Sequence, residues 1–136
     1  MMNSMMRRLF TIGLIAVMTL FVAQACAQSE GDSSRINAEQ FQEKIDETPG
    51  VIIDVRTQEE YNQGHLANVE HQLNLLNGDF EAALDSLDKE KTYYLYCRTG
   101  NRSGQATELM KKNGFKKVYN IGGFQDLVDA GVASKK

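Results

Sequence analysis

Cysteine is scarce in this sequence, and its scarcity excludes a fold held together by disulfides. The 136 residues contain two cysteines, Cys26 and Cys97. Cys26 lies close to the N-terminus, in a segment that we expect to be removed or lipidated, so the mature domain keeps one usable thiol. One thiol forms no intramolecular disulfide. Because an unpaired thiol is unusual in a chain with an export signal, Cys97 is a candidate reactive group.

Metal ligands at a suitable spacing and an excess of positive charge are also missing. No set of Cys, His, Asp and Glu residues has the spacing of a metal site, so we expect neither a metal nor another cofactor. The formal net charge is −3, and loss of the leader with Arg7 and Arg8 would make it more negative. This balance argues against nucleic acid, or an anionic membrane surface, as the main partner.

A single long apolar run occurs, close to the N-terminus. Arg7 and Arg8 precede this run, which extends from Leu9 to about Ala23, and small residues follow at Ala25-Cys26-Ala27. The order is typical of a secretory signal peptide, and the run is shorter than the roughly 20 residues that span a bilayer. We predict a signal peptide over residues 1–25, a polar linker over 26–35 and one domain over 36–136, exported to the periplasm.

Two processing sites fit this leader, and the sequence leaves both open. Ala25-Cys26-Ala27 suits ordinary signal peptidase, which would release a soluble protein. Ala23-Gln24-Ala25-Cys26 resembles a bacterial lipobox, in which Cys26 carries a lipid, although Ala23 stands where Leu is usual. We expect contact with the membrane only through the leader or through a lipid anchor at Cys26.

The rest of the chain alternates between strand and helix patterns. Apolar, β-branched or aromatic runs predict strands at Val51–Val55, Val69–Leu73, Thr92–Tyr96 and Lys117–Ile121. Amphipathic spacing and capping residues predict helices at 38–45 after Asn37, 58–61 after Thr57, 79–87, 105–112 and 124–129. This order indicates an α/β fold with a central, mostly parallel sheet of about five strands and helices on both faces.

The stretch Cys97-Arg98-Thr99-Gly100-Asn101-Arg102-Ser103 carries the most chemistry. It joins a predicted strand to a predicted helix, so backbone N–H groups at the positive end of the helix dipole can converge on the Cys97 sulfur. Gly100 lets the backbone approach that sulfur closely. Arg98 and Arg102 add two cations. These effects favour the thiolate, which is the nucleophilic form of cysteine.

This loop and the motifs around it resemble the rhodanese homology domain in its single-domain form. The matching pieces are Asp54-Val55-Arg56, Glu60-Tyr61, Gly64-His65-Leu66, the Cys97–Ser103 loop and Asn120-Ile121-Gly122-Gly123-Phe124. The resemblance implies a rhodanese-like fold and transfer of sulfane sulfur, as a persulfide on Cys97, from thiosulfate or a similar small donor to cyanide or a thiol. The sequence departs from the family at Asn68 in place of Gly, at Leu73 in place of Pro, and at Leu127 near a usual Trp.

The resemblance and the chemistry together predict roles for individual residues. Asp54, Arg56 and Arg102 match family positions around the site, and we expect Arg102 to be a structural partner of Asp54. Arg98 is the candidate for recognising an anionic donor. The loop residues Thr99, Gly100, Asn101 and Ser103 would provide an anion-binding nest. His65 is expected to pack and hydrogen-bond rather than to serve as a base.

Two other functions compete with sulfur transfer. Cysteine phosphatases and arsenate reductases have a longer spacing between Cys and Arg, whereas four residues separate Cys97 from Arg102 here. The shorter loop suits a single sulfur atom better than a tetrahedral oxyanion. A sulfur carrier or partner-binding module without turnover is the second alternative, because a fold does not fix a function. Turnover of thiosulfate with cyanide would distinguish an enzyme from such a module.

Overall fold

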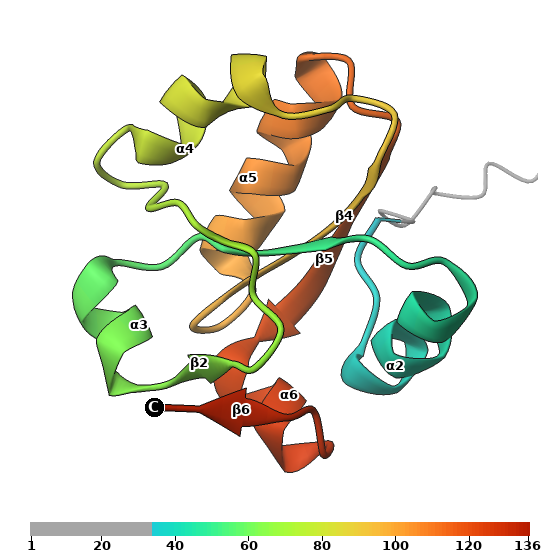
Figure 1. The fold of residues 1–136 in the computed structure, drawn as a ribbon, viewed down its shortest axis with the longest axis vertical. Coiled ribbons are helices and arrows are strands. Elements are labelled where there is room, and N and C mark those ends of the chain that lie inside the picture. The colour runs from blue at the N-terminus through green and yellow to red at the C-terminus, as the bar shows by residue number, and fades with distance from the viewer. Residues whose placement is uncertain (1–33) are drawn as a thin grey trace, which may run out of the picture. The chain divides into compact units, whose positions relative to one another are not determined.

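The computed structural model describes residues 34–136 (Figure 1). The predicted signal peptide and nearly all of the predicted linker, including Cys26, lie outside the described residues. Within the described part, none of the helices has the length and apolar character needed to cross a membrane.

A parallel sheet of four strands forms the centre of the domain. Its order is β3 (His71–Gln72), β1 (Val51–Asp54), β4 (Thr92–Cys97) and β5 (Lys117–Gly123). All neighbouring pairs run parallel. Asp54 pairs with Tyr96 in the ladder of β1 and β4, so Asp54 and Cys97 come to the same edge of the sheet. The predicted central parallel sheet is confirmed, with four strands where about five were expected.

Two further strands pair outside the central sheet. β2 (His65–Leu66) and β6 (Ser134–Lys135) form a short antiparallel pair, which brings the C-terminal segment beside β2 (Figure 1). Each strand has two residues, too few to show a hydrophobic period in the sequence. At the outer edge of β5, Arg35 makes an isolated parallel bridge to Asn120.

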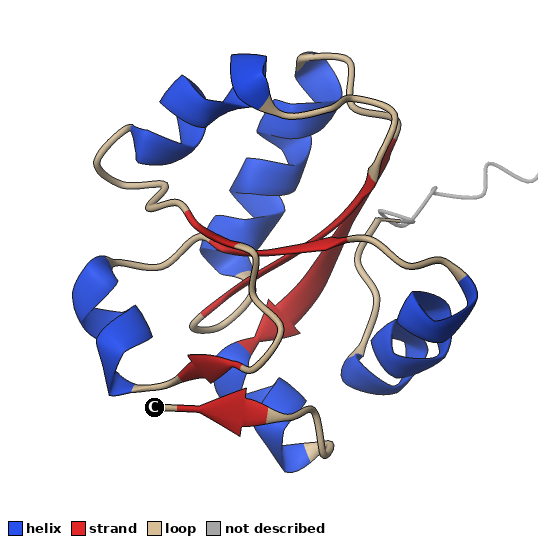
Figure 2. Ribbon diagram, viewed as in Figure 1, coloured by secondary structure: helices blue, strands red, loops and turns tan. Residues whose placement is uncertain are grey.

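Helices cover both faces of the sheet (Figure 2). They are α2 (Ala38–Glu47), α3 (Gln58–Gln63), α4 (Asp79–Ala83) with a following 3₁₀ turn (Leu84–Ser86), α5 (Asn101–Lys112) and α6 (Phe124–Asp129). Asn37 and Thr57 cap α2 and α3 as predicted, each within a capping box. α5 begins at Asn101, four residues before the predicted start, immediately after Gly100.

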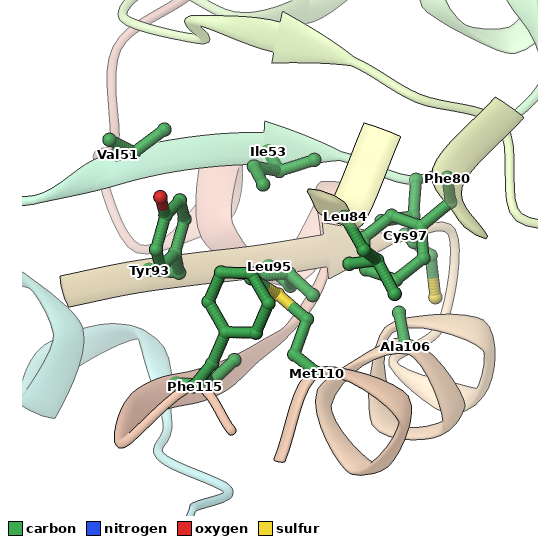
Figure 3. Packing of buried hydrophobic residues seen from close by; sticks show 12 residues of the cluster. Val51, Ile53, Phe80, Leu84, Tyr93, Leu95, Cys97, Ala106, Met110 and Phe115 are labelled. Carbon is green, nitrogen blue, oxygen red and sulfur yellow. The ribbon is translucent and has the colours of Figure 1, made fainter. Parts of the chain in front are cut away.

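The apolar side chains form one buried cluster on each face of the sheet. Val51 and Ile53 belong to one cluster with Phe80 of α4 and Met110 of α5 (Figure 3). Val55 lies in the same cluster. The other cluster lies against α2 and α6 and contains Phe41, Ile52, Leu66, Tyr94, Tyr96, Ile121 and Leu127. All four residues of β1 are buried, as its continuous β-branched run predicts.

The tyrosines of β4 alternate between the two clusters. Tyr93 packs edge-on against Phe115, and Tyr94 packs edge-on against Phe41 on the opposite face. Burial, with a smaller effect of Tyr119, raises the pKa of Tyr94 to about 12. Core packing accounts for Tyr93 and Tyr94, whereas Tyr96 also takes part in the polar network described below.

Candidate active site

The Cys97 side chain lies at the carboxyl end of β4, beneath the loop that leads into α5. Its exposed fraction is 0%, and it belongs to the same buried cluster as Phe80 and Ala106 (Figure 3). The Gly100 N–H donates to Cys97 Sγ across 3.0 Å, and the Ser103 hydroxyl lies 3.4 Å from the same sulfur. The thiol is therefore buried but surrounded on one side by polar donors.

These donors favour the charged form of the sulfur. Burial alone would raise the pKa of the Cys97 thiol, since a thiolate is costly away from water. The Ser103 hydroxyl and the backbone N–H groups of Ser103, Thr99 and Gly100 act in the opposite direction and bring the pKa below its ordinary value. The loop thus provides an anion nest around a single sulfur atom.

Two glycines allow the loop to adopt this shape. Gly100 has φ +94°, and a Cβ there would lie 3.1 Å from Nη2 of Arg35 and 3.2 Å from Cα of Gly122. A Cβ on Gly123 would lie 2.6 Å from the carbonyl oxygen of Arg98. The loop packs so closely on the end of β5 that a side chain is excluded at Gly123, and at Gly100 a side chain would require small shifts of its neighbours in addition to a strained backbone angle.

Asp54 and Arg56 form a buried ion pair at the edge of the sheet where Cys97 also lies. Asp54 is 0% exposed, and Arg56 Nη2 donates to its carboxylate across 2.7 Å and to the Gly64 carbonyl across 2.7 Å. The Tyr96 hydroxyl donates to the same carboxylate and accepts from the backbone N–H of Leu66. Burial, reinforced by Asp54, raises the pKa of Tyr96. The network joins β1, β2 and β4.

The prediction that Arg102 pairs with Asp54 is wrong. Both terminal nitrogens of Arg102 donate to the Glu60 carboxylate, each across 2.8 Å. Asp54 is instead bound by Arg56, which lies two residues further along the same segment. The bonds from Arg102, assisted by Thr57 and opposed by partial burial, lower the pKa of Glu60 to about 2.

A cavity opens beside this network and next to the cysteine loop. Its volume is about 530 Å³, and its lining includes the guanidinium-bearing residues Arg56 and Arg98 and the aromatic ring of Phe124. The Arg56 guanidinium lies 4.5 Å from the centre of that ring. Arg98 is exposed, as are Thr99 and Asn101. Glu60 lines the same hollow, but Arg102 binds its carboxylate and Asp54 binds the Arg56 guanidinium. Arg98 is therefore the exposed cation beside a hollow large enough for a small anion.

The two histidines of the described domain can be compared with this geometry, and His65 packs and hydrogen-bonds as expected. His65 stacks on Tyr61 with ring centroids 3.8 Å apart, and its Nδ1 lies 3.0 Å from the Tyr61 carbonyl oxygen. His71 is exposed on β3, an outer strand of the central sheet. Among residues 34–136, no three His, Cys, Asp or Glu side chains gather in a way that could hold a metal ion.

Comparison with known proteins assigns this fold and loop to a family. The Rhodanese-like domain family matches residues 37–130. The chain belongs to the rhodanese-like family. The domain is also similar to solved rhodanese-like structures, among them one from Staphylococcus aureus, with 30% identity, a TM-score of 0.60 and coverage of 76% of this chain and 99% of the other. A rhodanese-related protein from Thermoplasma volcanium has 28% identity, a TM-score of 0.62 and coverage of 74% and 96%.

Curated relatives of this rhodanese-like domain are longer proteins. "Putative sulfur carrier protein YrkF" from Bacillus subtilis is 38% identical over 96 residues, which is 68% of this chain and 50% of the relative. The tRNA uridine(34) hydroxylase of Yersinia pestis is 35% identical over 91 residues, which is 65% of this chain and 26% of the relative. The chain thus matches half or less of the length of these relatives.

Three residues of this rhodanese-like site were missed as site residues by sequence reasoning. Glu60 binds Arg102, Tyr96 binds Asp54, and Asn120 binds both Gly100 and Ser103 through its side chain. Glu60 and Asn120 are polar residues within two of the motifs that match the family, and this polarity could have marked them as site residues. Tyr96 gives no such signal, because a tyrosine in an apolar strand is explained by packing alone.

Proposed function

We propose that this rhodanese-like domain is a sulfurtransferase that moves sulfane sulfur from thiosulfate, or a similar donor, to a thiophilic acceptor such as cyanide or a thiol. The Cys97 thiolate attacks the outer sulfur of thiosulfate, a new S–S bond forms, and the S–S bond of the donor breaks with release of sulfite. The acceptor then attacks the outer sulfur of the persulfide, and the Cys97 thiolate is restored. The observation that carries this proposal is the group of N–H and hydroxyl donors on the Cys97 sulfur.

The charge of the neighbouring cavity supports an anionic donor. Arg98 is exposed and adjacent in sequence to Cys97, and Arg56 faces the same hollow. Arg102 is occupied by Glu60, which leaves Arg98 as the loop arginine better suited to meet a donor. Guanidinium groups bind oxyanions such as the sulfonate end of thiosulfate through paired N–H donors.

Burial of Cys97 adds a step to the proposed reaction. Because its side chain is 0% exposed, a donor reaches the sulfur only when the loop moves. The exposed residues Arg98 and Thr99 form the outer part of that loop. A closed loop would also shield the persulfide from water and from unrelated thiols between the two half-reactions.

A stoichiometric sulfur carrier is the second candidate. It is favoured by the same burial, since a shielded persulfide suits storage, and by similarity to the relative whose name includes "sulfur carrier". In that case Cys97 takes up one sulfur and gives it only to a specific partner. The two candidates share the first half-reaction and differ in the second.

Mass spectrometry after thiosulfate treatment tests both candidates. We expect the chain to gain one sulfur atom on Cys97 with release of one sulfite, and Cys97→Ser to gain none. Addition of cyanide should then yield thiocyanate over many cycles if the domain is an enzyme. An adduct without turnover supports the carrier, whereas absence of any adduct on the wild-type chain overturns both.

Export of the domain is a separate proposal that depends on the leader alone. We propose that the protein is periplasmic and either soluble or anchored through a lipid on Cys26. We also propose that nucleic acid is not among its partners. Sequencing of the mature N-terminus distinguishes cleavage after Ala27 from cleavage before a lipidated Cys26. An intact Met1 in the mature protein would contradict both processing routes.

A further inference from the structure

Asn120 connects Gly100, whose N–H faces the sulfur, with the Ser103 hydroxyl beside that sulfur. We propose that Asn120 is the positioning residue of the Cys97 loop, an inference that rests on the proposed role of Cys97. Asn120 is 2% exposed. Its Nδ2 donates to the Gly100 carbonyl across 2.9 Å, and its Oδ1 accepts from the Ser103 hydroxyl across 2.7 Å and from the Gly122 N–H across 3.0 Å.

The orientation of this amide is fixed by its neighbours. The Gly100 carbonyl oxygen can only accept a hydrogen bond, and the Gly122 N–H can only donate one. The amide nitrogen of Asn120 must therefore face Gly100, and its oxygen must face Gly122 and Ser103. A flipped amide would place like groups together at both contacts.

The first contact holds the carbonyl of Gly100, the residue whose N–H faces the sulfur. The Gly100 N–H donates to Cys97 Sγ across 3.0 Å, while the Gly100 carbonyl is held by Asn120. Gly100 has φ +94° and no side chain with which to hold its own position. The same carbonyl accepts from the Gly104 N–H across 3.1 Å, so Asn120 is its second donor. Loss of Asn120 removes one of the two bonds that hold this carbonyl and lets the Gly100 N–H move away from the sulfur more easily.

The second contact controls the Ser103 hydroxyl. This hydroxyl has one hydrogen and two acceptors within reach, Asn120 Oδ1 at 2.7 Å and Cys97 Sγ at 3.4 Å. When the sulfur is neutral, the hydrogen goes to Asn120, the closer oxygen. When the sulfur is charged, the hydrogen turns to the sulfur, and Asn120 Oδ1 keeps its bond from the Gly122 N–H. Asn120 thus holds Ser103 Oγ beside Cys97 while the sulfur is neutral, in a position from which the hydrogen can turn to the thiolate.

The backbone of β5 is shaped to present this side chain. Leu95 pairs with Asn120 but Tyr96 pairs with Gly122, so the ladder skips Ile121. Irregularities of this kind re-aim side chains and are common beside active sites. On the outer edge, the Asn120 N–H donates to the Ser34 carbonyl and its carbonyl accepts from the Ile36 N–H. Asn120 is therefore fixed from both sides of the strand.

The test is the pKa of Cys97, measured from the pH dependence of its alkylation by iodoacetamide. In Asn120→Ala both contacts are lost, and we expect the midpoint of the alkylation profile to shift upward by about one pH unit. Ser103→Ala should raise the pKa as well. The double variant should add little to Asn120→Ala, because Ser103 is already released from its position.

A second variant disturbs the amide without weakening the fold. A Cβ on Gly104 would lie 3.2 Å from Asn120 Nδ2, so Gly104→Ala pushes the amide away from Gly100 by a few tenths of an ångström. Gly104 lies within α5, where alanine is favoured over glycine. We expect the midpoint of the Cys97 alkylation profile to shift to higher pH, together with unchanged or higher thermal stability.

Asn113→Ala is the matched control. Asn113 donates through its side-chain amide to the Leu109 carbonyl at the far end of the same helix. We expect this variant to lose stability and to keep the wild-type pKa of Cys97. The inference is overturned if both Asn120→Ala and Gly104→Ala keep the wild-type pKa. Because alkylation needs no sulfur donor, that result is distinguishable from a failure of the wild-type chain to form a persulfide.

Discussion

Arg102 and Glu60 are joined through both nitrogens of the guanidinium and both oxygens of the carboxylate. The contact ties the first turn of α5 to α3, whose N-terminus Glu60 also caps together with Thr57. The two arginines of the cysteine loop therefore differ in function, although the sequence presents them alike. Arg102 fastens the loop to the scaffold, while Arg98 remains exposed at the cavity.

The first prediction concerns Glu60→Gln and pH. Because the pKa of Glu60 falls from 4.5 to about 2 on folding, its charge stabilises the folded state fully above pH 4.5. That stabilisation is lost as pH falls from 4.5 toward 2. Allowing for partial exposure, we expect Glu60→Gln to lower the free energy of unfolding at pH 7 by about 1–2 kcal/mol. Urea unfolding from pH 7 to pH 2 should show the difference from wild type shrinking below pH 4.5.

Glu90→Gln is the control for this experiment. Glu90 contacts Lys116 at 3.4 Å, and both side chains are at least 70% exposed. An exposed pair contributes little, so we expect no measurable change at any pH. A Glu60→Gln difference that stays constant down to pH 2 would contradict the role assigned to the carboxylate charge.

The second prediction separates the two loop arginines. Arg98→Ala should raise the KM for thiosulfate by about tenfold, the effect of one lost charge-assisted contact, and leave the melting temperature unchanged. Arg102→Ala should lower the melting temperature, because Glu60 loses both of its bonds. Steady-state kinetics and thermal unfolding on the same preparations provide the measurement. If Arg98→Ala loses stability in proportion to activity, a role in donor recognition is excluded.

The third prediction compares two glycines with similar backbone angles. Gly78 has φ +88° with no atom within 4 Å of an added Cβ, whereas Gly100 has φ +94° and close contacts. Gly78→Ala should therefore show only the backbone cost of about 1–2 kcal/mol. Gly100→Ala should cost more and should abolish most sulfur transfer. Equal effects of the two substitutions on stability and transfer would show that Gly100 matters only for its backbone angle.

The fourth prediction concerns the Tyr96 hydroxyl. Tyr96→Phe leaves the Leu66 N–H without its acceptor and the Asp54 carboxylate without one donor, so stability should fall by about 1–3 kcal/mol. Tyr94→Phe is the matched control, because Tyr94 lies on the same strand as Tyr96. Its hydroxyl donates to the Thr48 carbonyl at the end of α2, away from the cysteine loop. We expect only Tyr96→Phe to raise the KM for thiosulfate, because Asp54 holds Arg56 at the cavity. Equal KM values for the two variants would contradict this coupling.

Much of the fold could be predicted because burial leaves a pattern in the sequence. β1 is covered on both faces and appears as a continuous β-branched run, and the caps of α2 and α3 follow from Asn37 and Thr57. The first turn of α5 could not be predicted in this way. Residues Asn101 to Gly104 have the composition of a loop, yet they form a helical turn. Glu60 binds Arg102 of this turn, and Asn120 binds Ser103 and the preceding Gly100.

The same limit applies to the site. The Cys97 loop could be predicted from its motif because its chemistry depends on residues that are neighbours in sequence. The partner of Arg102, Glu60, lies 42 residues away in the sequence. Asp54 was an equally plausible carboxylate, because it belongs to another motif that matches the family. Only the three-dimensional arrangement shows that Arg56 binds Asp54 and that Arg102 binds Glu60. Choices among competing partners therefore lie beyond what spacing alone predicts.

The main-chain bonds of Ser34 and Ile36 to Asn120 have a practical consequence. A fragment trimmed to begin at residue 37, where the family match starts, would lack both bonds. It would expose the edge of β5 to pairing with a second molecule and promote self-association. The same cut would loosen the strand that carries Asn120, so activity measured on the shortened domain would underestimate that of the longer chain.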